Sequence, residues 1–367
     1  MKFSISREAL LRPLSLVAGV VERRQTLPVL SNVLLTVSDD ELSLTGTDLE
    51  VELIGRVAPS SIEESGAVTV PARKLMDICK SLPDQSEITV AIEEGRALLR
   101  SGRSRFTLST LPAAEFPSID EGQGSTELTL PRRTLKQLID ATGFAMAQQD
   151  VRYYLNGMLI ELRNHLVRTV ATDGHRLAVC SRSADIALEE PQRLILPRKG
   201  VVELSRLLDD SDEPITLMLG ASHLRVRTGA YTFTSRLVDG KFPDYERVIP
   251  KGGDKQVLAE RGELRQVLSR TAILSNEKYR GVRLNLEAGN LRVLANNPEQ
   301  EEAEENVAID YSGSALEIGF NVGYLIDVLS VLDTDQVQLT LSDPNSSALL
   351  EAPGGGDAMY VVMPMRL

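Results

Sequence analysis

Asp173 and His175 are the side chains in this sequence that come closest to a catalytic pair. They stand two residues apart in a turn-like Thr-Asp-Gly-His segment, and a carboxylate beside an imidazole could act as a dyad. No nucleophile or orienting group is evident beside them, and His165 and His223 add no metal-ligand spacing. Catalysis is therefore only a second hypothesis, behind the non-catalytic one developed below. In it, the protein is a metal-dependent nucleic-acid hydrolase that uses Asp173 and His175. A nuclease assay with Mg²⁺ or Mn²⁺, compared with His175→Ala, would test it.

Other features with possible chemistry point away from catalysis. Cys79 and Cys180 fall in a helix-like and a strand-like segment, which favours two buried, reduced thiols in a cytoplasmic protein. The Gly-rich residues 352–357 lack the Gly-Lys-Ser/Thr ending of a phosphate-binding loop. The acidic residues 301–305 could bind cations weakly, but a solvated loop or an interface is favoured. We expect no cofactor and no bound metal.

A supersecondary unit recurs three times along the chain. A short apolar strand ends in a small residue and a polar pair that starts at Thr47, Thr172 and Asn296, with steps of 125 and 124 residues. Two further landmarks keep nearly the same step, at residues 70–75, 196–201 and 320–325, and at residues 115–120 and 241–245. Repeats of this length are whole domains, so the sequence predicts domains at 1–125, 126–252 and 253–367. One shape built three times suggests an object that surrounds or spans something.

The composition lets each repeat bury its own core. The chain has 367 residues, of which 42% are hydrophobic and 25% charged. The first repeat reads as a strand at 2–6, a helix at 7–21 that Pro13 should bend or end, four strands, a helix at 73–82 and three strands. The later helices are predicted near residues 131–149, 198–209, 261–276 and 322–332. The fold class is therefore α+β, with two helices packed on antiparallel sheets in each domain.

Nothing in the sequence predicts a targeting or membrane segment. The first seven residues carry no apolar run after their charges, unlike a signal peptide. No stretch approaches the ~18 apolar residues that a membrane helix needs. We therefore expect a cytoplasmic protein with no membrane partner.

The charge is unevenly distributed. The chain carries a formal charge of −12, yet basic residues outnumber acidic ones in the six helical segments and their flanks. Helices that are equivalent by repeat would share one face, so that face would be relatively basic and suited to phosphates without base readout. The alternative is that helical surfaces simply tolerate Lys and Arg. The candidate phosphate-contacting residues are Arg24, Arg73, Lys74, Arg133, Lys136, Gln149, Arg152, Tyr153, Tyr154, Arg198, Lys199, Lys278 and Arg280.

Two further patches carry opposite charge. Arg residues crowd the end of the first repeat and Glu residues crowd the middle of the third, so a head-to-tail contact between two chains would pair them and close a ring. Four apolar side chains could form its dry centre. The candidate interface residues are Lys74, Arg96, Arg103, Arg105, Phe106, Leu108, Ile273, Leu274, Glu299, Glu301, Glu302 and Glu305.

Over its whole length the chain resembles the bacterial DNA polymerase III beta subunit family, the processivity clamps. The segments that carry the resemblance are residues 44–50, 101–106, 149–158, 171–178, 296–305 and 361–367. The resemblance implies a homodimeric ring of six domains with twelve inward-facing helices around duplex DNA, and no catalytic activity. The chain lacks ATPase motifs, so a partner must open the ring. DNA would be held by topology, and a docked polymerase would be kept at high effective concentration near the primer end.

The resemblance also implies a peptide-binding cleft between the second and third repeats. Its matching positions are Leu155, Thr172, Gly174, His175, Arg176, Leu177, Pro243, Arg247, Val248, Ser347, Val361, Val362, Met363, Pro364, Met365 and Arg366. Met and Val suit an adaptable apolar pocket, with Arg176, Arg247 and His175 holding polar atoms at its rim. From the residues alone, Met363 to Met365 read as a plain edge strand. Asn345 lies in a loop particular to this chain, which leaves peptide preference open there.

The partners implied for this cleft carry short motifs rich in Gln, Leu and Phe. They are the DNA polymerase III alpha subunit, the clamp loader delta subunit, translesion and repair polymerases, the mismatch repair protein and ligase.

Overall fold

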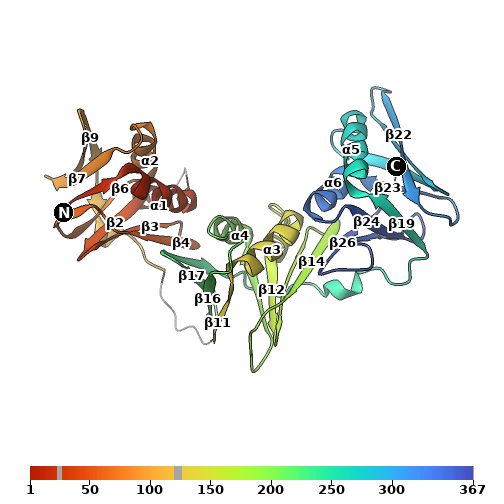
Figure 1. Ribbon diagram of the computed structural model, residues 1–367, viewed down its shortest axis with the longest axis horizontal. Helices are drawn as coiled ribbons and strands as arrows, with labels where there is room; N and C mark the ends of the chain where they lie inside the picture. The colour runs from red at the N-terminus through yellow and green to blue at the C-terminus, as the bar shows by residue number, and fades with distance from the viewer. Residues whose placement is uncertain (23–26, 120–125, 367) are drawn as a thin grey trace. The chain divides into compact units, whose positions relative to one another are not determined.

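The computed structural model describes residues 1–22, 27–119 and 126–366 of the chain (Figure 1). They form two compact units, Met1–Lys136 with Lys199–Leu237 and Gln137–Arg198 with Val238–Leu367. The middle repeat therefore contributes residues to both units. The predicted domain boundaries at 125/126 and 252/253 stay predictions.

The first unit contains two antiparallel sheets. In spatial order, one sheet consists of β5 (Ser61–Glu64), β1 (Lys2–Ser6), β7 (Glu87–Glu93), β8 (Arg96–Ser101) and β9 (Ser104–Ser109). The other consists of β10 (Leu111–Pro112), β6 (Gly66–Pro71), β2 (Asn32–Ser38), β3 (Glu41–Thr47), β4 (Val51–Val57), β18 (Tyr231–Arg236), β17 (His223–Thr228), β16 (Pro214–Leu219) and β11 (Thr126–Pro131).

The second unit contains one twelve-stranded antiparallel sheet. Its spatial order is β15 (Gln192–Pro197), β12 (Gly157–Arg163), β13 (Leu166–Thr172), β14 (Arg176–Ser183), β26 (Ala358–Val362), β25 (Ala348–Glu351), β24 (Gln336–Leu341), β19 (Lys255–Glu260), β22 (Glu302–Asp310), β21 (Asn290–Asn296), β20 (Gly281–Glu287) and β23 (Leu316–Asn321).

The helices cover these sheets in pairs. They are α1 (Arg7–Val20), α2 (Ala72–Ser81), α3 (Arg132–Thr142), α4 (Arg198–Ser205), α5 (Arg261–Thr271) and α6 (Val322–Val331). α1 and α2 lie side by side in the first unit, and α5 and α6 do so in the second (Figure 1). None of the helices within the described ranges is long and apolar enough to span a bilayer.

The sequence pattern explains how the first repeat begins. Phe3 and Ile5 alternate with polar residues in β1 and are buried. The hydroxyl of Ser6 then accepts a hydrogen bond of 3.3 Å from the backbone N–H of Ala9, which caps α1. α1 continues through buried Pro13 to Val20, so the expectation that Pro13 could end the helix was wrong.

Several helices end earlier than predicted. α3 stops at Thr142, where φ is −126°, and a 3-10 turn (Gly143–Ala145) follows instead of helix to 149. α5 likewise gives way to a 3-10 turn (Ala272–Leu274). The chain leaves the α-helical conformation at each of these turns. β5 was missed because it is only four residues long and Ile62 is its single apolar residue.

The same strand pairing joins neighbouring repeats twice. In the first unit β4 pairs with β18, with Gly55 opposite Tyr231. In the second unit β14 pairs with β26, with Cys180 opposite Ala358. By repeat position β22 corresponds to β4 and β14, and β9 corresponds to β18 and β26.

The third pair of equivalent strands is open within this chain. β9 is the last strand of its sheet. β22 pairs along its length with β21, but its other edge contacts β19 only at Ile309 and Asp310. Within the described residues, each strand therefore keeps a row of backbone groups available on one edge.

Candidate functional site

A cavity of about 150 Å³ lies in the second unit beside the junction of β14 and β26. It is bounded by the turn after β13, the 3-10 helix Tyr245–Arg247 and the segment that follows β26. Its lining residues are Arg152, Leu155, Thr172, Gly174, Arg176, Leu177, Pro243, Asp244, Tyr245, Val248, Val361 and Met363. Nine of the sixteen predicted cleft residues are therefore brought together here.

The strand pairing positions the apolar wall of this cavity. Leu177 lies opposite Val361 in the β14·β26 ladder. Beyond the ladder, the backbone N–H of Met363 donates to the His175 carbonyl at 2.9 Å, and that of Met365 donates to the Gly319 carbonyl at 2.9 Å. The C-terminal segment is thus fixed as a wall of the cavity, where the residues alone suggested a plain edge strand.

The turn between β13 and β14 forms a second wall. The Thr172 hydroxyl donates to the Arg176 carbonyl at 2.6 Å and accepts from the Gly174 N–H at 3.1 Å. Gly174 has a φ of +87°, and a Cβ there would lie 2.9 Å from an Arg152 guanidinium nitrogen. Both the backbone conformation and the close approach of Arg152 therefore favour glycine.

The buried side chain of Tyr245 forms the floor of the cavity. Tyr245 packs with Leu177, Val361 and Phe242 in one apolar cluster. Its hydroxyl donates to the buried Glu161 carboxylate at 2.6 Å and accepts from Arg168 at 3.0 Å. Burial, and then the hydrogen bond to Glu161, raise the pKa of Tyr245. The phenol is therefore neutral and held in place at physiological pH.

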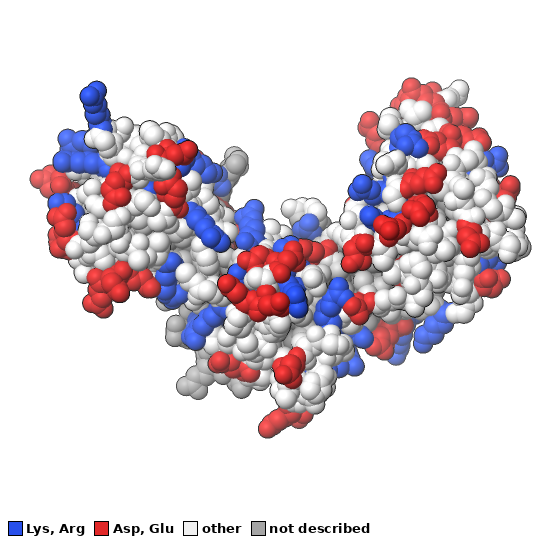
Figure 2. Space-filling model, in the orientation of Figure 1, with Lys and Arg blue, Asp and Glu red and all other residues white. Residues whose placement is uncertain are grey.

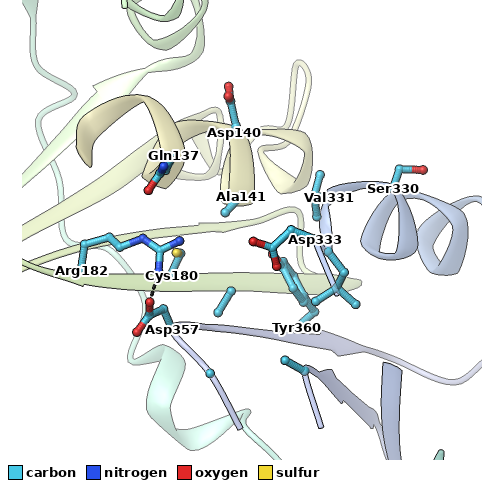
Figure 3. Close-up of a pocket in the computed structure, with 14 residues that line it drawn as sticks. Gln137, Asp140, Ala141, Cys180, Arg182, Ser330, Val331, Asp333, Asp357 and Tyr360 are labelled. Carbon is cyan, nitrogen blue, oxygen red and sulfur yellow. Dashed lines mark hydrogen bonds and ion pairs between the residues drawn. The ribbon is translucent and has the colours of Figure 1, made fainter. Parts of the chain in front are cut away.

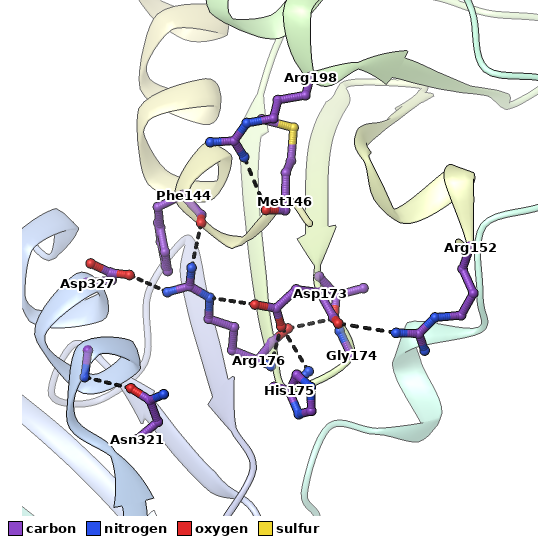
Figure 4. Close-up of polar contacts among 12 residues, drawn as sticks. Phe144, Met146, Arg152, Asp173, Gly174, His175, Arg176, Arg198, Asn321 and Asp327 are labelled. Atoms are coloured by element: carbon purple, nitrogen blue, oxygen red, sulfur yellow. Dashed lines mark hydrogen bonds and ion pairs between the residues drawn. The ribbon is translucent and has the colours of Figure 1, made fainter. Parts of the chain in front are cut away.

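Arg176 is engaged by the protein itself (Figure 4). Its guanidinium donates to Asp173 at 3.2 Å, to the Phe144 carbonyl at 2.9 Å and to Asp327 on α6. It also lies over the Tyr324 ring, 4.6 Å from the centroid. This side chain therefore ties β14 to α6 as well as lining the cavity, and its role in holding ligand atoms stays a prediction.

Asp173 is engaged as well. Its Oδ1 accepts from the backbone N–H groups of His175 and Arg176 at 2.9 and 3.0 Å, and its Oδ2 accepts from the Arg176 side chain (Figure 4). The exposed His175 ring stacks on Tyr324 with centroids 6.4 Å apart. Asp173 therefore shapes the turn and does not orient the imidazole of His175.

The remaining predicted cleft residues lie outside the cavity lining. Arg247 has a side chain that is 84% exposed and pairs with Asp244 at 2.7 Å, as suits a rim position. Val362 is fully buried in the core. The other residues that do not line the cavity are His175, Ser347, Pro364, Met365 and Arg366, and Asn345 is also absent from the lining.

Sequence reasoning missed three lining residues. Asp244 and Tyr245 belong to the third repeated landmark, at 241–245, so a signal was present. Arg152 was assigned to DNA alone, yet it lines the cavity and donates to Asp150 at 3.0 and 2.9 Å. These hydrogen bonds lower the pKa of Asp150 to about 2. The local pair thus orients Arg152 toward the turn.

The candidate DNA-contacting residues differ in their availability. Those with exposed side chains are Arg73, Lys74, Arg133, Gln149, Arg152, Tyr153, Lys278 and Arg280, while Lys136 is half-buried. Arg133 pairs with Asp212 at 2.9 Å, and Lys278 lies over the Tyr279 ring. Arg24 lies outside the described residues.

Three of these candidates have clear structural roles. Lys199 donates to Glu22 at 2.9 Å and also to Asp48, whose side chain is nearly buried. Arg198 is half-buried and donates to the Met146 carbonyl at 3.1 Å. Tyr154 packs against the apolar cluster beneath the cavity. These contacts show what each side chain does within the chain, and contact with DNA stays a prediction for all three.

Most of the charged candidate interface residues lie on or beside the two open edges. Arg96, Arg103 and Arg105 are exposed on β8, β9 and their turn, where Figure 2 shows basic side chains. Figure 2 also shows acidic side chains crowding the region of β22. There Glu305 accepts two hydrogen bonds from Arg270, at 2.6 and 2.5 Å, which lower its pKa.

The apolar interface candidates are unevenly exposed. Ile273 is 76% exposed, whereas Phe106 and Leu274 are half-buried and Leu108 is buried. At the acidic edge, Glu301 accepts a hydrogen bond from Asn297 at 2.6 Å. The positions of Lys74, Glu299 and Glu302 are exposed.

Three family models match the chain in succession. The N-terminal, central and C-terminal domains of the DNA polymerase III beta subunit match residues 1–120, 129–244 and 246–366. The chain belongs to the DNA polymerase III beta subunit family. It is thus a DNA sliding clamp, a non-catalytic processivity factor of replication built from three α+β clamp domains. The second hypothesis, a hydrolase using Asp173 and His175, was wrong.

Known relatives match over the full length. The beta sliding clamps of Pseudomonas putida and Escherichia coli K12 are 64% and 55% identical over 367 residues, covering 100% of both chains in each case. A solved structure of a Pseudomonas aeruginosa sliding clamp bound to griselimycin is 62% identical, has a TM-score of 0.96 and covers 100% of both chains. As a sliding clamp of DNA polymerase III, the chain has DNA and the polymerase as partners.

Proposed function

We propose that two copies of this chain close a ring around duplex DNA by pairing β9 of one protomer with β22 of its partner. The observation that carries this proposal is the repeated junction, since the equivalents of β22 and β9 pair antiparallel as β4·β18 and β14·β26. A closed ring of three junctions per protomer leaves neither β9 nor β22 without a partner strand. In the single chain β9 ends its sheet, and β22 pairs on its outer edge only at Ile309 and Asp310.

The internal junctions also give the expected register. β9, β18 and β26 start at Ser104, Tyr231 and Ala358, and β4, β14 and β22 start at Val51, Arg176 and Glu302. The differences between these start residues convert the pairing of either internal junction into a pairing of β9 with β22. Both internal junctions give the same residue pairs. The resulting pairs are Ser104 with Asn306, Arg105 with Glu305, Phe106 with Glu304, Thr107 with Ala303 and Leu108 with Glu302.

This register brings opposite charges together. Arg105 falls directly opposite Glu305, so the carboxylate that already accepts from Arg270 gains a second guanidinium. Close charge pairs across an interface fix its register and steer the encounter. The patches therefore favour a head-to-tail contact over a contact of like ends.

A second contact follows from Lys199. In the first unit its ammonium reaches Asp48, in the turn before β4. By repeat position Lys199 corresponds to Arg73, and Asp48 corresponds to Asn297. Arg73 of one protomer, with Lys74 beside it, would thus face the turn of its partner that contains Glu299 and Glu301.

The ring would hold DNA through enclosure and weak phosphate contacts. The exposed basic side chains suit sequence-blind contacts that break and reform during sliding. We assign these contacts to Arg73, Arg133, Gln149, Arg152, Lys278 and Arg280, with Arg24 retained from the sequence. Weak contacts suffice because a closed ring leaves DNA only by opening or at an end.

We further propose that the cavity beside β14 and β26 receives partner peptides. Its apolar wall of Leu177, Val361 and Met363 suits Leu and Phe side chains, and exposed Arg247 can meet polar atoms. Capture of a ligand by the P. aeruginosa clamp in its griselimycin complex supports ligand binding in this family. The proposed partners are the polymerase III alpha subunit, the clamp loader delta subunit, translesion and repair polymerases, the mismatch repair protein and ligase, in the cytoplasm at the nucleoid.

Two measurements test these proposals. Sedimentation velocity at micromolar concentration should give a dimer, and a monomer would contradict the ring. Fluorescence anisotropy with a labelled Gln/Leu/Phe-rich peptide should show binding that is lost when residues 363–367 are deleted, while the dimer persists. Unchanged binding would mean that the cleft has been placed wrongly.

A further inference from the structure

A second cavity in the second unit, of about 550 Å³, has no role in the functions above. It lies between α3, the C-terminal end of α6 and the strands β14 and β26 (Figure 3). It shares no lining residue with the peptide cleft, because it uses Cys180 and Arg182 of β14 while the cleft uses Arg176 and Leu177. One junction therefore carries two separate cavities.

The lining of this cavity has an excess of negative charge. Asp140, Asp333 and Asp357 contribute three carboxylates, against the single guanidinium of Arg182. Arg182 is paired with Asp357 (Figure 3). Asp333 makes no hydrogen bond or ion pair with any residue in the described part of the chain. A carboxylate is thus left available at the end of α6.

Tyr360 supplies an independent sign that a ligand belongs here. The residue is only 1% exposed, and its hydroxyl has no hydrogen-bond partner among the described residues. Burial raises the pKa of this phenol, followed by the influence of Cys180 and Asp333, which both line the cavity. Tyr360 lines the cavity, so its unengaged hydroxyl oxygen can accept a hydrogen bond from a ligand there.

We propose that this cavity binds an alkylammonium or guanidinium group. Such a cation donates N–H groups to the Asp333 carboxylate and to the Tyr360 oxygen. The Arg182–Asp357 pair closes one side, which leaves Asp333 as the main anionic partner. The cation can come from a small free amine or from a Lys or Arg side chain of a protein partner.

Calorimetric titration of the full-length protein tests this assignment. The probes are 1,4-diaminobutane, the short peptide acetyl-Gly-Lys-Gly-amide and the uncharged analogue 1,4-butanediol. Asp333→Asn should weaken binding of the cationic probes about tenfold, as expected for the loss of a charge-assisted hydrogen bond. Tyr360→Phe should weaken it severalfold, and it keeps the ring packing, so folding should be preserved.

Asp335→Asn is the matched control. Asp335 is exposed two residues further along and does not line the cavity, so its variant should bind as the parent does. Binding of the diamine assigns a free amine as one source, and binding of the peptide alone assigns a partner side chain. The proposal is overturned if neither cation binds, if butanediol binds equally well, or if Asp333→Asn and Asp335→Asn behave alike. Because peptide-cleft binding should be unchanged in Asp333→Asn, the outcome is independent of the proposed cleft.

Discussion

The internal junctions β4·β18 and β14·β26 occupy the same places in the repeat as the edges that β9 and β22 leave open. Phe233 and Tyr360, in β18 and β26, are fully buried, whereas their counterpart Phe106 in β9 is half-buried. An aromatic residue therefore occupies the equivalent position in all three strands. Only the aromatic residue of β9 has no partner strand from the same chain beside it.

The charged positions differ more strongly. At the place of Glu305, the internal junctions carry Ile54 and Val179, and at the place of Arg105 they carry Thr232 and Met359. An internal junction is always paired, so apolar contacts cost nothing in solubility. An edge that is exposed before assembly needs charge to prevent wrong pairing and to select its partner. A more polar junction would also suit a ring that opens for loading.

Charge reversal at the open edge should have the largest effect. Glu305→Arg places like charges opposite Arg105 and beside Arg270, so the dimer dissociation constant should rise by about a hundredfold or more. Sedimentation equilibrium measures this. Glu287→Arg, on an exposed end of β20, should leave the dimer intact. Adding Arg105→Glu to Glu305→Arg should restore much of the affinity, and a lack of rescue would contradict the proposed register.

Truncating the shared aromatic position separates folding from assembly. Phe233→Ala empties a fully buried site and should lower the free energy of unfolding by about 3–5 kcal/mol. Phe106→Ala should change unfolding of the protomer much less but weaken the dimer about tenfold or more. Urea unfolding and sedimentation distinguish the two effects. If both variants lose stability equally and the dimer is untouched, β9 is not the interface strand.

Loosening Arg176 tests how an internal junction supports the cleft. Asp327→Asn removes the charge that holds the Arg176 guanidinium on α6 and should weaken peptide binding about fivefold, in line with loss of a charge-assisted hydrogen bond. The dimer should be unaffected because the change lies away from β9 and β22. Fluorescence anisotropy measures the peptide affinity. Asp335→Asn is the control, and equal affinities in the two variants would remove Arg176 from the supporting role.

Acid should weaken the open-edge junction modestly. Hydrogen bonds from Arg270 lower the pKa of Glu305 in the single chain, and Arg105 should lower it further in the ring. The extra affinity is therefore complete above the free-chain pKa and is lost as the pH falls through the lower ring-state pKa. Sedimentation from pH 7 to pH 4 should show weaker dimers, with a smaller trend in Glu305→Gln. Dimers that tighten on acidification would contradict the pairing.

Much of the fold was predictable because it depends on local patterns. Alternation around Phe3 and Ile5 and the threefold recurrence of the Thr47 turn gave strands and repeats. The contacts of Arg176 were not predictable, since Asp327 lies 151 residues away in the sequence. Lys199 was likewise assigned to DNA, although its partner Asp48 is 151 residues distant. Charge type is visible in a sequence, but the partner that neutralises it depends on the tertiary fold.

Retention on nicked circular DNA, measured before and after the circle is cut, distinguishes enclosure from adhesion. The protein is loaded by its loader, free protein is removed, and the bound fraction is followed over time. Enclosure by a ring of β9·β22 junctions predicts long retention on the circle and rapid loss from the cut molecule through its ends. Equal retention on the circular and linear forms would contradict it.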